Sequence, residues 1–135
     1  MPVVALHHYT IRCTADEVGS LVDFYTPVLG LMVGARPELP MAGAWLYAGD
    51  EPIVHLYANA ESADLPPEPS TGPLDHFAFR SANLSTMRAH LRSQCVPFFE
   101  APVPGCPLHQ VFLHDPKGLK IELTFWLENE SPGSV

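Results

Sequence analysis

An internal repeat divides this chain of 135 residues into two nearly equal halves. Residues 6–13, Leu-His-His-Tyr-Thr-Ile-Arg-Cys, align with residues 74–81, Leu-Asp-His-Phe-Ala-Phe-Arg-Ser, at an offset of 68. Later segments of the halves also align, at an offset of 67: residues 45–47 with 112–114, and 54–56 with 121–123. Such a repeat predicts two copies of one unit, neither of which makes a convincing independent domain.

The sequence predicts the same order of elements in both halves: a strand, a helix and three more strands. In the first half, Thr14 and Glu17 form a capping box, and apolar residues follow at helical spacing until Pro27 and Gly30 end the helix. In the second half, Asn83 is the expected cap of a helix over about 83–94. The expected strands lie near 4–13, 31–36, 43–48 and 53–58, then near 74–81, 97–101, 109–114 and 119–125.

Turn and linker signals separate these elements. Residues 50–52, Asp-Glu-Pro, and 115–118, Asp-Pro-Lys-Gly, are expected to turn the chain before the last strand of each half. Residues 59–73 contain four prolines and no periodicity, which is typical of an exposed connector. We therefore expect a single domain with module one at about 4–58, a linker at 59–73, module two at about 74–125 and a frayed tail at 126–135.

Composition excludes several classes of protein. Apolar residues make up 47% of the chain, which is typical of a protein with a packed core. Seven Lys and Arg oppose 15 Asp and Glu, for a net charge of −8, so neither nucleic acid nor an anionic membrane surface is an expected partner. The chain has no apolar stretch of about 20 residues and no charged leader, so we expect a soluble, cytoplasmic protein. The three cysteines, Cys13, Cys95 and Cys106, lack paired spacing and are expected to be free thiols.

Alternation along the strands gathers polar side chains on one face of each half. His8 and His76 lie opposite the aromatic residues of the first strands, while His55 and Glu122 lie opposite the apolar residues of the last strands. The same faces receive Arg12, Arg80, Tyr57, Lys120 and Thr124. Imidazole and carboxylate groups suit Zn²⁺, Ni²⁺, Fe²⁺ or Mn²⁺, so a metal site is one interpretation. Ordinary surface or hydrogen-bonded side chains are the other.

The remaining histidines are given no role in this site. A shift of one residue in the first strand would exchange His8 for His7, so that alternative stays open. We expect His90, His109 and His114 to be structural or exposed.

At these residues the chain resembles the vicinal oxygen chelate superfamily. This superfamily includes glyoxalase I, fosfomycin-resistance proteins, methylmalonyl-CoA epimerase, bleomycin-resistance proteins and extradiol dioxygenases. The resemblance covers about residues 4–125 and rests on four segments in this order: 6–12, 24–31, 74–79 and 111–123. It implies an α+β fold in which two βαβββ modules form a curved mixed sheet around a divalent metal, usually in a homodimer that can combine modules from two chains.

By position, the resemblance makes His8, His76 and Glu122 the metal ligands. His55 stands where glyoxalase I has a glutamate that binds metal and moves the substrate proton, so it is expected to be either a fourth ligand or a general base. With only one carboxylate the site keeps a positive charge, which favours a substrate that is or becomes an oxyanion. Arg12 or Arg80 would be further partners of that anion, and Tyr57 and Trp45 are expected to contact the substrate.

Three functions remain in competition. The leading hypothesis is a metal-dependent, glyoxalase-like lyase or isomerase that binds a small molecule and moves a proton through His55 or Glu122. The second is an Fe(II) extradiol-type dioxygenase, although Phe112 stands where such enzymes carry a tyrosine. The third is a metal-free, drug-sequestering protein that holds a ligand against Trp45, Tyr47 and Tyr57, which would leave the retained His/His/Glu set unexplained.

Overall fold

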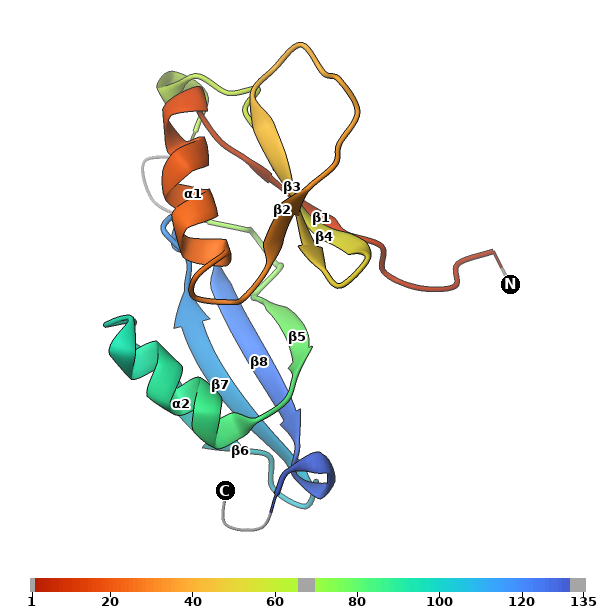
Figure 1. The fold of residues 1–135 in the computed structure, drawn as a ribbon, viewed down its shortest axis with the longest axis vertical. Helices are drawn as coiled ribbons and strands as arrows, with labels where there is room; N and C mark the ends of the chain where they lie inside the picture. The colour runs from red at the N-terminus through yellow and green to blue at the C-terminus, as the bar shows by residue number, and fades with distance from the viewer. Residues whose placement is uncertain (1, 66–69, 132–135) are drawn as a thin grey trace. The chain divides into compact units, whose positions relative to one another are not determined.

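A computed structural model of the chain describes residues 2–65 and 70–131. The chain divides into two compact units, Met1–Pro67 and Glu68–Val135, each containing one four-stranded mixed sheet (Figure 1). The α+β class and the two-module architecture expected from the repeat are confirmed. None of the described helices has the length and apolar character needed to cross a membrane.

Module one follows the expected order of elements. It contains β1 (Tyr9–Arg12), the 3-10 helix η1 (Ala15–Glu17), α1 (Val18–Tyr25), β2 (Met32–Gly34), β3 (Gly43–Ala48), β4 (Glu51–Tyr57) and η2 (Ser62–Asp64). The strand order is β1-β4-β3-β2, with β1 parallel to β4 and the other pairs antiparallel.

Module two repeats this topology. It contains β5 (Phe77–Ser81), α2 (Leu84–Ser93), β6 (Phe99–Pro102), β7 (Leu108–His114), β8 (Lys120–Trp126) and the 3-10 helix η3 (Leu127–Asn129). The strand order is β5-β8-β7-β6, and β5 is the strand that pairs in parallel.

Strand register reproduces the two offsets of the sequence repeat. In module one Thr10 pairs with His55, and in module two Ala78 pairs with Glu122. The first strands are therefore related by an offset of 68 and the last strands by 67, as in the sequence alignment. His55 and Glu122 are thus equivalent positions, and so are His8 and His76.

The core of each module lies on the apolar face of its sheet. Val54 and Leu56 of β4 are buried, as are Ile121, Leu123 and Phe125 of β8, as the alternation predicts. The helices contribute the buried side chains Leu21 and Tyr25 from α1, and Leu84 and Leu91 from α2.

The helix ends differ in part from the prediction. The Thr14–Glu17 capping box is present, with the Thr14 N–H donating to Glu17 Oε1 at 2.9 Å. Helix α1 ends at Tyr25, and Gly30 adopts a φ of 77° in the turns that follow. The Asn83 side chain does not cap α2, because its own backbone is left-handed with a φ of 64°.

Glu130 caps α2 instead. Its carboxylate accepts hydrogen bonds from the backbone N–H groups of Asn83, at 3.1 Å, and Leu84. The expectation of a frayed tail is therefore wrong for residues 126–130. Trp126 ends β8, and η3 brings the Glu130 carboxylate to the helix. Residues 132–135 of the expected tail lie outside the described residues.

The first strand of module one is shorter than expected. It begins at Tyr9, and the described residues before it are in neither helix nor strand (Figure 1). Its partner strand β4 is irregular at this level, because the register of β4 with β3 shifts between the Leu46–Val54 and Tyr47–Pro52 pairs. The turn before β4 is also displaced, since Glu51 and Pro52 belong to the strand and Gly49, with a φ of 59°, turns the chain.

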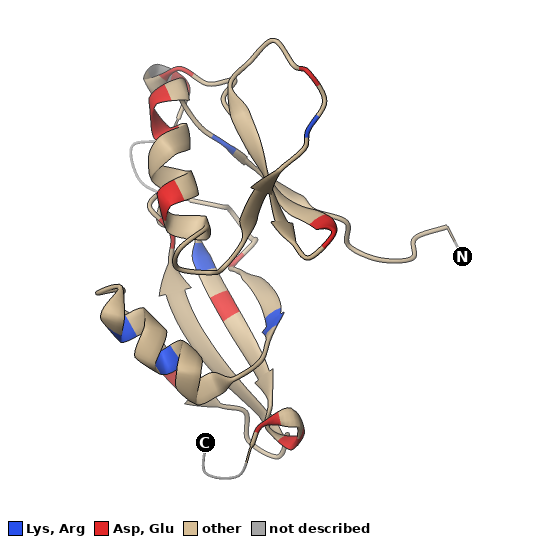
Figure 2. Cartoon of the chain, viewed as in Figure 1, with Lys and Arg blue, Asp and Glu red and all other residues tan. Residues whose placement is uncertain are grey.

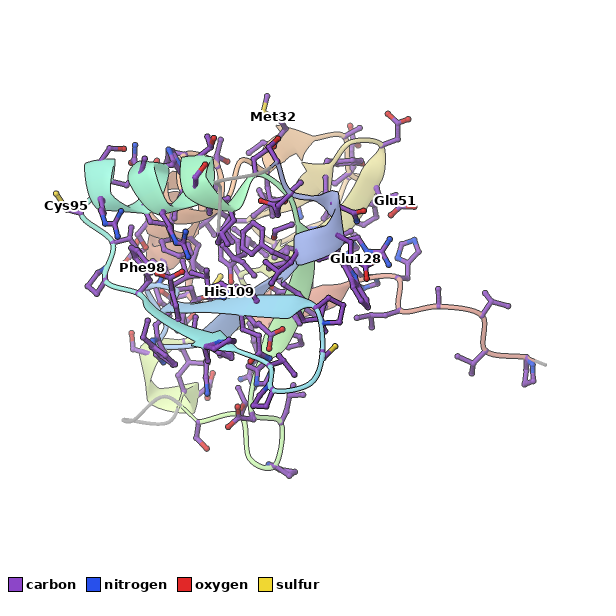
Figure 3. All side chains as sticks on the ribbon, turned by 90° about the horizontal axis from the view of Figure 1, so that it is seen from below. Met32, Glu51, Cys95, Phe98, His109 and Glu128 are labelled. Atoms are coloured by element: carbon purple, nitrogen blue, oxygen red, sulfur yellow. The ribbon has the colours of Figure 1, made fainter. Side chains whose placement is uncertain are left out.

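None of the three cysteines is part of a disulfide, as predicted. Cys13 is buried, whereas Cys95 is exposed and its sulfur points away from the sheet (Figure 3). The proposed connector at 59–73 contains η2, and residues 66–69 of it lie outside the described residues.

Candidate metal and ligand site

His76 and Glu122 face each other on the polar face of module two. His76 directly precedes β5, and Glu122 is a residue of β8. Figure 2 shows an acidic segment in the middle of this strand. His76 Nε2 lies 3.2 Å from Glu122 Oε1. Glu122 is only 5% exposed, and a buried carboxylate needs polar partners to offset its desolvation.

Two neighbouring side chains orient the Glu122 carboxylate. Gln110 Nε2 donates to Oε1 at 2.9 Å, and the Thr124 hydroxyl donates to Oε2. Gln110 and Thr124 are themselves a cross-strand pair of β7 and β8. Gln110 was not singled out in the sequence, although alternation along β7 places it on the same face as Phe112, the partner of Glu122.

Asp75 fixes the proton of His76. His76 Nδ1 lies 2.7 Å from Asp75 Oδ2, and Lys120 Nζ lies 3.3 Å from the same oxygen. Hydrogen bonds from His76 and then from Lys120 lower the pKa of Asp75, so its carboxylate is ionised at neutral pH and can only accept. His76 Nδ1 therefore carries a proton. Strand alternation does not fix the direction of the Asp75 side chain, because β5 begins only at Phe77.

The donor set of this pair suits a metal ion. With a proton on Nδ1, the neutral His76 ring presents a lone pair at Nε2 toward Glu122 Oε1, which also has lone pairs. The two atoms attract each other only through a proton or a cation. Metal-binding histidines commonly donate their other ring N–H to a carboxylate, as His76 does to Asp75.

Aromatic rings cover one side of the pair. The Phe112 ring meets His76 edge to face, with centroids 5.7 Å apart, and stacks on Phe99 at 4.9 Å. Lys120 Nζ lies 4.9 Å from the Phe112 centroid. These rings pack against one side of His76, whose side chain remains 31% exposed, and Lys120 is a nearby positive charge.

The equivalent face of module one carries a stack of three rings. The His55 ring lies between His8, with centroids 3.8 Å apart and planes at 10°, and Trp45, at 4.0 Å and 13°. His55 is 8% exposed, and its Nε2 lies 3.0 Å from the carbonyl of Pro52. Since a carbonyl only accepts, Nε2 carries the proton in this tautomer.

Burial and histidine neighbours favour the neutral form of His55. Desolvation lowers its pKa most, and the nearby His8 lowers it further, while the bond to Pro52 opposes the shift. His7 Nδ1 and His8 Nδ1 lie 2.8 Å apart, so one donates to the other. A ring nitrogen binds metal in the plane of its own ring, and the nearly parallel planes of His8 and His55 do not converge on one ion.

A cavity of about 280 Å³ opens on the same face of module one. Its walls come from β1, β3, β4 and the loop after β2, and they comprise Thr10, Arg36, Leu39, Trp45, His55, Leu56 and Tyr57. Trp45 and Tyr57 thus line a cavity, and the ligand contacts expected of them stay a prediction. Arg36 lies in a loop without periodicity, so no sequence signal marked it. Its Nη1 is buried without a hydrogen-bond partner among the described residues, which costs about 1–3 kcal/mol for an unsatisfied donor.

The two arginines expected at the site lie in the first strand of each module. Arg12 and Arg80 are exposed, at strand positions that pair with Tyr57 and Thr124. In residues 2–65 and 70–131, no group of three or more His, Cys, Asp or Glu side chains is placed to hold a metal ion.

The comparisons with known proteins establish the family. Residues 5–123 match the Glyoxalase/Bleomycin resistance protein/Dioxygenase superfamily, and the chain belongs to it. It is 31% identical over 125 residues to Glyoxylase I 4 of Arabidopsis thaliana, covering 90% of this chain and 70% of that protein.

Solved structures share the fold at lower identity. A glyoxalase family protein from Bacillus anthracis matches with a TM-score of 0.73 and 17% identity, over 91% of this chain and 95% of that one. Lactoylglutathione lyase from Agrobacterium tumefaciens matches with a TM-score of 0.66 and 18% identity, over 93% and 96%. The trypanothione-dependent glyoxalase I of Leishmania major matches with a TM-score of 0.66 and 21% identity, over 90% and 86%.

Proposed function

We propose that the chain is a metal-dependent, glyoxalase-like lyase or isomerase acting on a small molecule with two neighbouring oxygens. The observation that carries this proposal is the pairing of His76 Nε2 with Glu122 Oε1 at 3.2 Å, with the proton of His76 held on the other nitrogen by Asp75. The family and its glyoxalase relatives support the same chemistry.

His76 and Glu122 would hold the metal, and His8 of module one is the proposed third ligand. In the tautomer in which His8 Nδ1 donates to His7, the Nε2 of His8 keeps a lone pair for ligation. Zn²⁺, Ni²⁺, Fe²⁺ and Mn²⁺ all accept imidazole and carboxylate ligands. A bound divalent metal supplies Lewis-acid polarisation of the substrate oxygens.

The residues around the ligands position them. Asp75 sets the tautomer and direction of His76, and Gln110 and Thr124 hold the Glu122 carboxylate in place. His55 is assigned to proton transfer and not to metal binding. Its Nε2–H donates to the Pro52 carbonyl, and its ring is nearly parallel to the His8 ring, so the two rings do not point at one ion. Its Nδ1 is then the nitrogen that accepts a proton from the substrate.

Metal content tests the proposal. Protein purified without chelator should contain divalent metal, and His76→Ala or Glu122→Gln should remove most of it. His109→Ala is the matched control, because His109 also contacts a carboxylate, Glu100 Oε1 at 2.8 Å, outside the proposed site. Equal metal content in all four proteins would refute the assignment. The homodimer stays a prediction, which the mass in solution tests.

A further inference from the structure

Arg36 occupies an unusual position in the wall of the module-one cavity. It lies in the loop between β2 and β3, which leaves the sheet as a wide arch (Figure 1). Two hydrogen bonds hold the loop around the arginine. The Tyr47 hydroxyl donates to the carbonyl of Ala35, and Arg36 Nη2 donates to the carbonyl of Met41 at 2.9 Å. The guanidinium is thereby held at the cavity before any ligand arrives.

The positive charge of Arg36 is not neutralised within the described parts of the chain. No carboxylate of residues 2–65 or 70–131 forms an ion pair with it, although the exposed Glu38 lies two residues further along the loop. Its Nη1 is buried and lacks a hydrogen-bond partner. A half-buried guanidinium with an unused donor favours an anion that brings its own acceptor atoms.

Gly43 makes room for this arrangement. A Cβ built at Gly43 would lie 2.9 Å from Arg36 Nη1 and 2.2 Å from the carbonyl oxygen of Leu56. The missing side chain therefore lets the guanidinium approach β3 closely. The equivalent position in module two, by the offset of 67, is Gln110, so this space is particular to module one.

The rest of the cavity is suited to a flat apolar group with nearby polar atoms. Trp45 and Leu39 supply apolar wall, and the hydroxyl-bearing Thr10 and Tyr57 line the same space. A volume of about 280 Å³ is at the lower limit of ordinary small-molecule sites. The occupant is therefore a small molecule.

We propose that this cavity binds small carboxylates that carry a planar apolar group, with Arg36 as the residue that recognises the carboxylate. The ligand carboxylate would accept from Nη1, the donor left without a partner among the described residues, while Nη2 keeps its hydrogen bond to the Met41 carbonyl. The apolar group then lies against Trp45. The inference deepens the proposed function by naming a substrate class, but binding at Arg36 requires no metal.

Binding of phenylacetate and its neutral analogue phenylacetamide tests the proposal in the full chain with metal removed by chelator. The chain has two tryptophans, so the indole N–H signal of Trp45 in a ¹H–¹⁵N spectrum reports the cavity and that of Trp126 is an internal reference. We expect phenylacetate to move the Trp45 signal selectively and phenylacetamide to bind about tenfold more weakly, the loss of one charge-assisted interaction.

Three variants test whether Arg36 binds the carboxylate of the ligand. Arg36→Gln should weaken phenylacetate about tenfold and leave phenylacetamide unchanged, whereas Arg36→Lys should recover part of the loss because the charge remains. Arg92→Gln is the matched control, since Arg92 lies over Phe98 in module two, 5.6 Å from its centroid. A dispersed spectrum of each variant establishes that it is folded.

Equal affinities for acid and amide, or undiminished phenylacetate binding to Arg36→Gln, would overturn the proposal. An unmoved Trp45 signal throughout the phenylacetate titration would overturn it as well. Because metal is absent, none of these results depends on whether His76 and Glu122 bind a metal. Conversely, equal metal content in the parent protein and in the His76→Ala and Glu122→Gln variants, together with selective phenylacetate binding, would refute the enzyme assignment alone.

Discussion

His55 and Glu122 occupy equivalent positions in the two modules, each in the last strand and each paired with the first strand, at Thr10 and Ala78. Of the described residues, only these two and Asp115 are buried polar or charged side chains. Asp115 is explained by its turn, where Oδ1 accepts from the N–H groups of Lys117 and Leu119 at 2.8 and 2.9 Å. His55 and Glu122 lie on the polar faces. The repeat therefore keeps a buried polar residue at this position, a histidine in module one and a glutamate in module two.

Gln110 is expected to support metal binding without touching the metal. In Gln110→Ala the Glu122 carboxylate loses a hydrogen bond of 2.9 Å, so its orientation is less restricted. We predict a loss of metal affinity of about 10- to 100-fold, measured by competition with a chromophoric chelator. Gln94→Ala, at the C-terminal end of α2, is the control and should bind metal like the parent protein. Equal affinity in both variants would remove Gln110 from this role.

His55 should make the chelator-treated protein less stable below neutral pH. The pKa of His55 is lowered in the fold by burial and by His8, from its ordinary value of 6.5. The unfolded chain therefore takes up this proton first as the pH falls, and stability is lost from about 6.5 down to the lowered pKa. Urea denaturation across this range should show a shallower decline for His55→Gln. An unchanged slope would contradict the lowered pKa.

Glu130 should stabilise module two through helix α2. Glu130→Ala removes the acceptor of the Asn83 and Leu84 N–H groups and a negative charge at the helix N-terminus. We predict a loss of about 1 kcal/mol in the free energy of unfolding, measured in urea. Glu128→Ala is the matched control, because Glu128 is exposed in η3 and should have little effect. A similar loss in both variants would indicate a general charge effect instead of a cap.

Gly43 and Gly19 should respond oppositely to alanine. Gly43→Ala places a Cβ 2.2 Å from the Leu56 carbonyl oxygen, so the strand pair must shift, at a cost of about 1–3 kcal/mol. Gly19→Ala meets no atom within 4 Å and should stabilise α1 by about 0.5–1 kcal/mol. Thermal unfolding of the two variants measures both changes. A neutral Gly43→Ala would show that the β3–β4 approach is easily relaxed.

The repeat and the strand alternation predicted much of the fold, because both depend on local spacing. The offsets of 68 and 67 reappear in the pairing of Thr10 with His55 and of Ala78 with Glu122. The apolar faces of β4 and β8 were predicted for the same reason. Strand ends were less accurate, since the start of β1 at Tyr9 depends on its partner strand β4, whose register with β3 shifts at the same level.

The candidate site was predictable only where alternation applies. His55 and Glu122 lie within β4 and β8, where alternation applies, whereas His8, Asp75 and His76 precede β1 and β5 and their placement depends on the chain before each strand. Arg36 gave no signal, since its place in the cavity depends on how an irregular loop closes over Gly43. The cap at Glu130 was missed for a similar reason, as its partners are 46 and 47 residues away in the sequence.

A crystal structure of the protein loaded with Zn²⁺ or Ni²⁺, with anomalous data collected at the metal edge, tests the central claim most directly. The account predicts one dominant anomalous peak bonded to His76 Nε2 and the Glu122 carboxylate, with His8 as a further ligand and His55 outside the ligand set. A metal bound elsewhere, or a saturated crystal without a peak at His76 and Glu122, would contradict it.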